Sequence, residues 1–165
     1  MLTLDRSIRD AIVAHARRDH PDEACGVVAG RSGTDRATRL VEMLNAERSP
    51  TFYRFEPMEQ LALYREMDDR DEEPVVVYHS HTATEAYPSR TDVNLAGEPD
   101  AHYVLVSTRD PHATADDIEF RSFRIRDGLV TEEPVEIVAG EPGDAVAVDA
   151  GHGVQAGHCA GVGHG

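Results

Sequence analysis

The sequence predicts one mixed α/β (α+β) domain, in which a central layered β-sheet is combined with helices. Segments with helical spacing of apolar residues alternate with short segments rich in valine, isoleucine and aromatic residues. The dipeptide Asp127-Gly128 between two of the strand-like segments is typical of a tight hairpin. The chain has 165 residues, 40% of them hydrophobic, which suffices to bury one core.

The first expected element is a helix over residues 5–20. Its core-facing side chains recur at intervals of three and four, and they are Ile8, Ala11, Ile12 and His15. Pro21 ends this helix, because proline has no backbone N–H with which to continue it.

Two strands and an irregular segment follow. Residues 24–29 and 39–44 are short apolar runs typical of strands, and a glycine-containing turn over residues 30–33 follows the first of them. Residues 45–53 show no periodicity, and they end in the aromatic pair Phe52 and Tyr53, which we expect to be exposed.

The second half of the domain repeats this alternation. Pro57 is suited to begin a helix with Leu61, Tyr64 and Met67 spaced by threes, and a mostly acidic stretch over residues 68–73 ends it. The strongest strand of the sequence follows, because β-branched and aromatic residues fill it. It covers residues 74–79, and the remaining expected elements are a helix at 90–95 and strands at 102–107, 118–125 and 129–138.

The composition changes from Ala139 onward. Glycine, alanine and histidine dominate, and no apolar residue larger than valine occurs, so this stretch cannot bury enough surface to order itself. The sequence therefore predicts a folded domain over residues 1–139 and a mostly disordered tail over residues 140–165. The metal-binding residue types of the tail match no defined site, and they are His152, His158, Cys159 and His164.

Charge and hydropathy exclude several classes of partner. Acidic residues outnumber basic ones by 31 to 16, and a formal charge of −15 repels a phosphate backbone, so we expect no nucleic-acid partner. No apolar run approaches the roughly 20 residues of a membrane-spanning helix, and no secretion signal is recognisable, so we expect a cytoplasmic protein without a membrane partner. The sequence does not indicate an oligomeric state.

His79 and His81 stand at the end of the strongest strand. Alternate side chains of a strand share a face, with Cα atoms roughly 6.5–7 Å apart, so both imidazoles can bind one ion at about 2.0–2.1 Å. Ten residues separate His81 from Asp92, and a loop of that length can return a carboxylate to the same ion. Three protein ligands leave a fourth zinc position open, as in catalytic sites.

Parts of this pattern also have a simpler structural interpretation. A His-x-His pair alone is more often a pair of ordinary, partly buried histidines. Ser89 and Asp92 are typical of a capping box that begins the helix at residues 90–95, and Ser89 can serve in both roles.

Taken together, the residues resemble a known metal motif. His79-Ser80-His81, the ten-residue gap and Pro88-Ser89-x-x-Asp92 look like the motif of the JAMM (JAB1/MPN/Mov34) metallopeptidases. That family also has a glutamate near the start of its first strand, which Glu23 in Pro21-Asp22-Glu23-Ala24-Cys25-Gly26 matches. The resemblance runs from the first helix to Val138. It implies that residues 1–139 form a JAMM/MPN domain, a central mixed β-sheet flanked by helices with cytidine-deaminase-like layering.

The resemblance also implies the roles of the site residues. One Zn²⁺ ion with a bound water is held by His79, His81 and Asp92, Glu23 is the general acid/base, and Ser89 hydrogen-bonds the developing oxyanion. This agrees with zinc chemistry, since zinc lowers the pKa of its water toward roughly 7 and a nearby carboxylate takes the proton.

Residues 45–53 and 77–92 are similar to one branch of the family, which releases cysteine from the C-terminal glycine of a ubiquitin-like sulfur-carrier protein. The resemblance implies zinc-dependent hydrolysis of a Gly–Cys amide in cysteine biosynthesis, with this carrier as the partner. Three alternatives stay open. The same chemistry can process another carrier precursor or conjugate, the chain can be a non-catalytic MPN scaffold, or it can be a cupin-like metal protein.

The cupin alternative rests on His79-x-His81-x-x-x-Glu85, which resembles the cupin metal pattern. The glycines that this pattern has around its ligands are absent, and helical segments occupy too much of the chain for a β-barrel.

Three further residues have open or minor roles. A carrier's glycine tail can pair with an exposed strand edge, and Phe52 and Tyr53 either line such a groove or pack as core or lid. Cys25 lies two residues from Glu23, but no histidine is placed to activate it, and strand alternation makes it a small buried hydrophobe. With two cysteines and no Cys-x-x-Cys pair, a disulfide framework and a four-thiolate zinc site are excluded.

Overall fold

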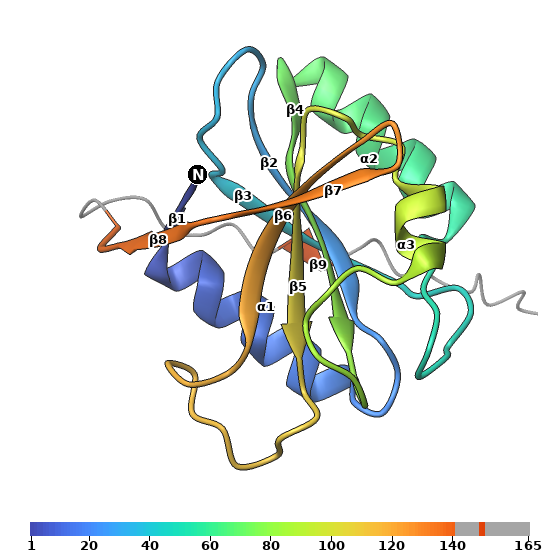
Figure 1. The fold of residues 1–165 in the computed structure, drawn as a ribbon. Helices are drawn as coiled ribbons and strands as arrows, with labels where there is room; N and C mark the ends of the chain where they lie inside the picture. Colours follow the sequence, from blue (N-terminus) through green and yellow to red (C-terminus); the bar gives the residue numbers. More distant parts are fainter. Residues whose placement is uncertain (141–148, 151–165) are drawn as a thin grey trace, which may run out of the picture.

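The computed structural model describes residues 1–140 and 149–150. Its helices are interspersed with strands up to Leu95, and the described elements that follow are strands (Figure 1). In chain order they are β1 (Leu2–Asp5), α1 (Arg6–Asp19), β2 (Cys25–Arg31), β3 (Arg39–Met43), α2 (Pro57–Asp69), β4 (Glu72–His81), α3 (Arg90–Leu95), β5 (His102–Ser107), β6 (Phe120–Arg126), β7 (Leu129–Glu133), β8 (Val135–Val138) and β9 (Asp149–Ala150).

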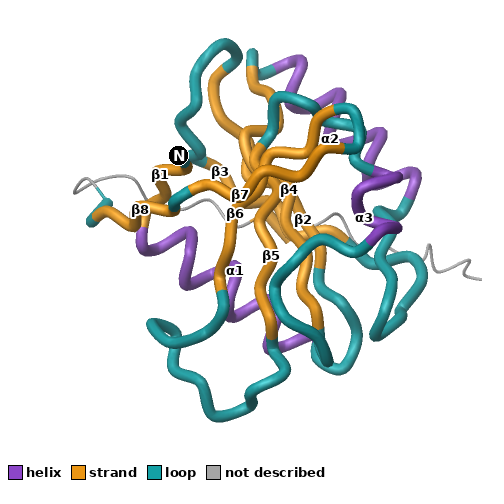
Figure 2. Tube along the Cα trace, in the orientation of Figure 1, coloured by secondary structure: helices purple, strands orange, loops and turns teal. Residues whose placement is uncertain are grey.

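The main sheet has seven strands in the order β7-β6-β5-β4-β2-β3-β9. The β4–β5 and β3–β9 pairs are parallel and the other neighbours are antiparallel, so the sheet is mixed, as the family resemblance implies. A separate two-stranded parallel sheet joins β1 to β8. The tube in Figure 2 shows the strands gathered at the centre, with helices and loops around them.

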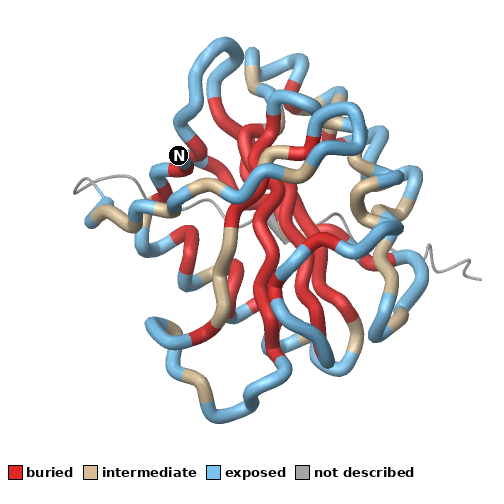
Figure 3. The backbone as a smooth tube through the Cα atoms, in the orientation of Figure 1, coloured by how far each residue is buried: buried red, intermediate tan, exposed pale blue. Residues whose placement is uncertain are grey.

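Helices cover both faces of the main sheet, with α1 on one side and α2 and α3 on the other (Figure 1). The alternation along β2 shows the two faces, because Val28 joins the core under α1 whereas Val27 and Ala29 join the core under α2. The central strands are therefore buried along most of their length (Figure 3). The flanked, layered sheet expected from the sequence is confirmed.

Helix α1 packs through the face that the sequence indicates. Ile8 and Ile12 are fully buried, and His15 Nδ1 lies 2.7 Å from the hydroxyl oxygen of Tyr78 on β4. The Tyr78 ring fills the space beside Gly26, where an added Cβ would clash with that oxygen. A glycine at position 26 therefore allows the helix, the tyrosine and the strand to pack closely.

The structure also corrects several expectations. Strand β1 was not predicted. The single strand expected over residues 129–138 is divided at Pro134, after which β8 leaves the main sheet to pair with β1. On α2 the buried side chains are Leu63 and Met67, whereas Leu61 is exposed. The hairpin is confirmed, since Asp127 and Gly128 have φ angles of 51° and 76° between β6 and β7.

The tail predicted over residues 140–165 lies outside the described residues, except for Gly140 and β9, which pairs with β3. No helix in the described part of the chain has the length and apolar character needed to cross a membrane.

Candidate metal centre

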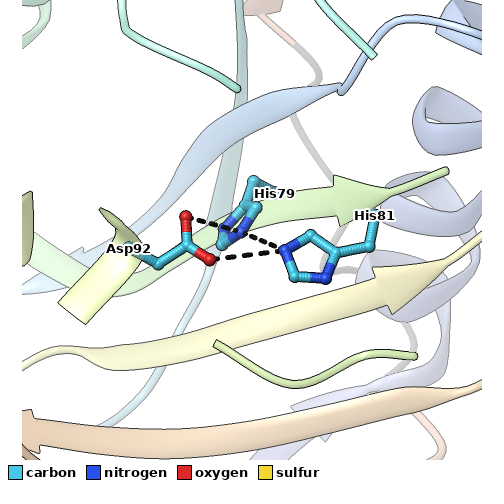
Figure 4. Close-up of side chains that lie close together, drawn as sticks. All are labelled: His79, His81 and Asp92. Atoms are coloured by element: carbon cyan, nitrogen blue, oxygen red, sulfur yellow. Dashed lines mark hydrogen bonds and ion pairs between the residues drawn. The ribbon is translucent and has the colours of Figure 1, made fainter. Parts of the chain in front are cut away.

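Three potential ligands meet where β4 ends. Along β4, Val77 packs into the core on the side of α2, and strand alternation places His79 and His81 in the same row. Asp92 lies in the first turn of α3, and its carboxylate turns back toward both imidazoles (Figure 4). One ligand atom from each residue lies within 4.8 Å of the other two.

The separations between these atoms fit a zinc ion. His79 Nε2 lies 3.2 Å from His81 Nε2 and 3.4 Å from Asp92 Oδ1. His81 Nε2 lies 3.3 Å from Asp92 Oδ2. A tetrahedral ion with ligand bonds of about 2.0–2.1 Å holds its ligands roughly 3.3–3.4 Å apart. Two nitrogen donors and one carboxylate at this spacing match a divalent cation with one position free for water or substrate.

The two histidines are held differently. His81 Nδ1 lies 2.9 Å from the backbone oxygen of Glu85, to which it donates when protonated, so its Nε2 keeps a lone pair for the site. Among the described residues, the buried Nδ1 of His79 makes no hydrogen bond. Packing orients His79 instead, since the ring of Tyr53 stacks on its imidazole.

The pKa values of His79 and Asp92 favour metal binding, whereas that of His81 lets a proton compete with a metal ion for its imidazole. Burial lowers the pKa of His79, which keeps that imidazole neutral. Burial opposes the charge of His81 and Asp92, but their mutual hydrogen bonding outweighs it. The pKa of His81 is therefore raised, and that of Asp92 lies well below its usual value. The carboxylate of Asp92 is thus ionised at any pH at which the histidines can bind a metal.

Ser89 forms the capping box that the sequence predicts. Its Oγ accepts a hydrogen bond from the Asp92 N–H at 3.1 Å, and Asp92 Oδ2 accepts one from the Ser89 N–H at 2.6 Å. The hydroxyl of Ser89 acts only as an acceptor in this box, so its hydrogen stays available for a further bond. The capping role is confirmed, and an oxyanion role for Ser89 stays a prediction.

Glu23 lies beside the three-residue cluster. In the antiparallel β2–β4 pair Cys25 faces His79, and continuing this register by two residues brings Glu23 opposite His81. The side chain is buried, and burial together with the charge of Asp92 raises the pKa of Glu23 to about 7, although the charge of His81 opposes this. A carboxyl group with this pKa can accept and return a proton near neutral pH.

A loop over residues 45–51 is hydrogen-bonded both to Glu23 and to the end of β4, which carries the two histidines. Asn45 Nδ2 donates to the backbone oxygen of Glu23 at 3.0 Å, and the Glu23 N–H donates to the Ser49 oxygen at 2.9 Å. At the end of β4, Thr82 Oγ1 donates to the Pro50 oxygen at 2.9 Å. This positioning role was missed in the sequence, where the segment showed only a lack of periodicity.

Two cavities adjoin the site. One of about 250 Å³ has Phe52, Tyr53, Tyr64 and Asp92 in its wall. Tyr53 also packs on Phe55, so the packing role left open for this residue applies, and its role in a groove for a carrier tail stays a prediction. Phe52 and Tyr53 are half-buried rather than exposed. The second cavity, of about 290 Å³, lies on the side of Glu23 and is mostly polar.

Two other candidate residues do not serve this site. Cys25 is fully buried, and burial raises the pKa of its thiol well above the usual range, so it is not a nucleophile at neutral pH. The side chain of Glu85 is 62% exposed and lies near Arg121 instead of the histidines. The cupin pattern is therefore wrong, and the mixed sheet with helices on both faces is not a cupin barrel.

Comparisons with known sequences agree with the site. The family described as prokaryotic homologs of the JAB domain matches residues 5–126. The chain is 67% identical over 138 residues to the CysO-cysteine peptidase of Mycobacterium tuberculosis, which covers 84% of this chain and 92% of that protein. It is 32% identical over 111 residues to the desampylase of Haloferax volcanii, which covers 64% of this chain and 80% of that protein.

A solved structure agrees as well. The solution structure of protein DSY2949 from Desulfitobacterium hafniense superimposes with a TM-score of 0.72 at 32% identity, over 85% of this chain and 94% of that one. The family match spans most of the described sheet, including β2 and β4, and it confirms the JAMM resemblance of the sequence. The chain therefore belongs to the prokaryotic JAB-domain family and is a JAMM peptidase.

Proposed function

We propose that this chain hydrolyses the amide bond between the C-terminal glycine of a ubiquitin-like sulfur carrier and cysteine, with one zinc ion held by His79, His81 and Asp92. The observation that carries the proposal is the 3.2–3.4 Å spacing of their ligand atoms beside Glu23. Zinc is the metal that the family resemblance implies, and the nitrogen and oxygen donors suit it. The catalytic unit is the domain over residues 1–139.

Glu23 moves the proton in this reaction. A bound Zn²⁺ supplies acidification of water and polarisation of the scissile carbonyl. As the water oxygen adds to the glycine carbonyl, Glu23 takes the released proton, and it returns a proton to the amine nitrogen when the C–N bond breaks. The products are the carrier carboxylate and the free amine. A pKa of about 7 lets Glu23 perform both transfers without a large energetic cost.

Ser89 is the proposed donor to the developing oxyanion. It stands at the start of α3, one turn from Asp92, and the capping box fixes its backbone. Because its Oγ accepts from the Asp92 N–H, its own hydroxyl hydrogen is directed elsewhere and can stabilise negative charge on the carbonyl oxygen.

The relatives support the substrate class. The mycobacterial protein at 67% identity is named for its action on CysO-cysteine, and the 138 aligned residues include both segments that approach the site, residues 45–53 and 77–92. The H. volcanii desampylase, at 32% identity, supports a second candidate function, the cleavage of a carrier from another protein. Intact-mass analysis after incubation with a carrier–cysteine adduct and with a carrier–protein conjugate distinguishes these two.

The substitution Glu23→Gln tests the mechanism. We expect the variant to keep one zinc ion per chain and to lose roughly 10²–10⁴-fold in kcat on the carrier–cysteine adduct, as for loss of a general acid/base. Glu85→Gln, at an exposed position near the site, is the matched control and should retain full activity. Unchanged cleavage by the Glu23→Gln variant would remove the mechanism.

A further inference from the structure

None of the three proposed metal ligands lines the polar cavity beside Glu23. Its wall holds three acidic residues and one basic one, and its lining residues are Asp19, Asp22, Glu23, Leu44, Asn45 and Arg48. Because Glu23 lies in this wall and also faces His81, the cavity is adjacent to the group that protonates the departing amine. It is therefore placed to receive the leaving group.

Arg48 is the one positive charge in this wall. Within residues 1–140 its guanidinium makes neither a hydrogen bond nor an ion pair, although the nearby Arg54 pairs with Glu47 at 2.7 Å. Arg48 also has a φ angle of 44°, in the left-handed region that favours glycine or asparagine. The chain thus places an arginine, with its charge available, where the backbone would favour a smaller residue.

The contacts of the loop fix Arg48 relative to Glu23. The residue after Arg48 accepts a hydrogen bond from the Glu23 N–H at 2.9 Å, and the Arg48 N–H donates to the Asn45 oxygen at 3.2 Å. Asn45 in turn donates to the Glu23 oxygen at 3.0 Å. The arginine is therefore attached to the same short network of backbone bonds as the proposed acid/base.

The two signs of charge in the cavity match a free amino acid. Asp19 is already engaged, since its carboxylate contacts His15 Nε2 at 3.0 Å and Arg18 Nε at 3.3 Å. Asp22 and Glu23 can face an ammonium group, whereas Arg48 can bind a carboxylate through two parallel hydrogen bonds. An amino acid leaving the carrier presents both groups on one carbon atom.

The geometry points to Arg48 as the residue that binds the free α-carboxylate of the departing amino acid. This inference rests on the proposed function and deepens it. A contact with the free α-carboxylate would select substrates in which a single residue follows the carrier glycine. A conjugate joined through a lysine side chain has no free carboxylate next to the scissile amide, and it would lack this contact.

The test compares two adducts of the M. tuberculosis carrier CysO, one ending in cysteine and one in cysteinamide. They differ only in the negative charge that Arg48 is proposed to bind. We expect the wild-type protein to cleave the acid with a kcat/KM roughly 10- to 100-fold above that of the amide, because one charge-assisted pair stabilises binding by about this much. The difference should lie mostly in KM. Arg48→Gln should remove this preference by slowing the acid alone, and Arg48→Lys should restore part of it.

Controls separate the charge from the fold and from the proposed chemistry. Arg31→Ala removes an equal charge at the opposite end of β2, where the side chain is 82% exposed, and should keep the preference for the acid. Equal cleavage of acid and amide by the wild-type protein, or equal slowing of both by Arg48→Gln, would overturn the role of Arg48 and leave the peptidase function intact. Cleavage of neither adduct would instead refute the proposed function, and the role of Arg48 with it.

Discussion

The ring of Tyr53 stacks on the imidazole of His79, with ring centroids 4.4 Å apart and planes inclined by 24°. Since the Nδ1 of His79 has no hydrogen-bond partner among the described residues, this contact orients the ring. We predict that Tyr53→Ala weakens zinc binding roughly 2- to 10-fold, whereas Tyr53→Phe changes it less than about 2-fold, because an aromatic pair contributes about 0.5–1.5 kcal/mol. Titration against a competing chelator measures both, and equal losses would show that stacking is not what orients His79.

Asp92 and Glu85 give opposite predictions for the metal. Asp92→Asn keeps a side-chain oxygen for the helix cap but loses the charged ligand, so zinc affinity should fall by more than about 100-fold, beyond the range of residues that only orient ligands. Glu85→Ala should leave zinc affinity unchanged, because that side chain is exposed, lies near Arg121 and is not among the three clustered groups. Metal content after dialysis tests both, and loss of zinc from the Glu85 variant alone would refute the assignment.

Zinc affinity should depend on pH through one histidine. The pKa of His81 is raised, that of His79 is lowered by burial, and Asp92 stays ionised. Protons therefore compete with zinc chiefly at His81, and below the pKa of this residue the affinity should fall about tenfold for each pH unit. Chelator competition between pH 8 and pH 5 measures the slope. A slope of two decades per unit would mean that His79 also takes up a proton.

Glu23 should make the zinc-free protein less stable as the pH rises. Burial raises its pKa from 4.5 to about 7, so the folded state holds a proton that the unfolded state has lost between these values. The free energy of unfolding is therefore highest below pH 4.5, and it falls by about 3 kcal/mol as the pH rises to about 7. Urea unfolding in the presence of a chelator should show this loss for the wild-type protein. The Glu23→Gln variant is the control and should lack this loss. Identical pH profiles for the wild-type protein and the variant would contradict the prediction.

Much of the fold could be predicted from local pattern. Helix α1, strand β4 and the Asp127-Gly128 hairpin each carry their signal within a short window. Strand β1 does not, because it has only four residues, runs directly into α1 and is stabilised by pairing with β8 at the far end of the described domain. The division of residues 129–138 needed the same long-range information, although Pro134 marked the point where a strand ladder loses a donor.

The candidate site divides in the same way. His79, His81 and Asp92 could be named from spacing, and the structure brings their ligand atoms together. Glu23 required the family resemblance, since a lone glutamate before a strand has no local signature. Asn45 and Arg48 could not be found, because their placement depends on backbone hydrogen bonds from an aperiodic loop to Glu23 and along the loop itself.

The shared hydrogen bonds of Ser89 and Asp92 couple two processes that are usually considered apart. The same carboxylate that faces the histidines also stabilises the first turn of a six-residue helix, so we expect that unwinding α3 would remove a proposed metal ligand and that withdrawing a bound cation would weaken α3. Metal uptake should therefore protect the amide protons of residues 92–95 from exchange with solvent. Local order at this corner of the domain would then report whether the enzyme is loaded.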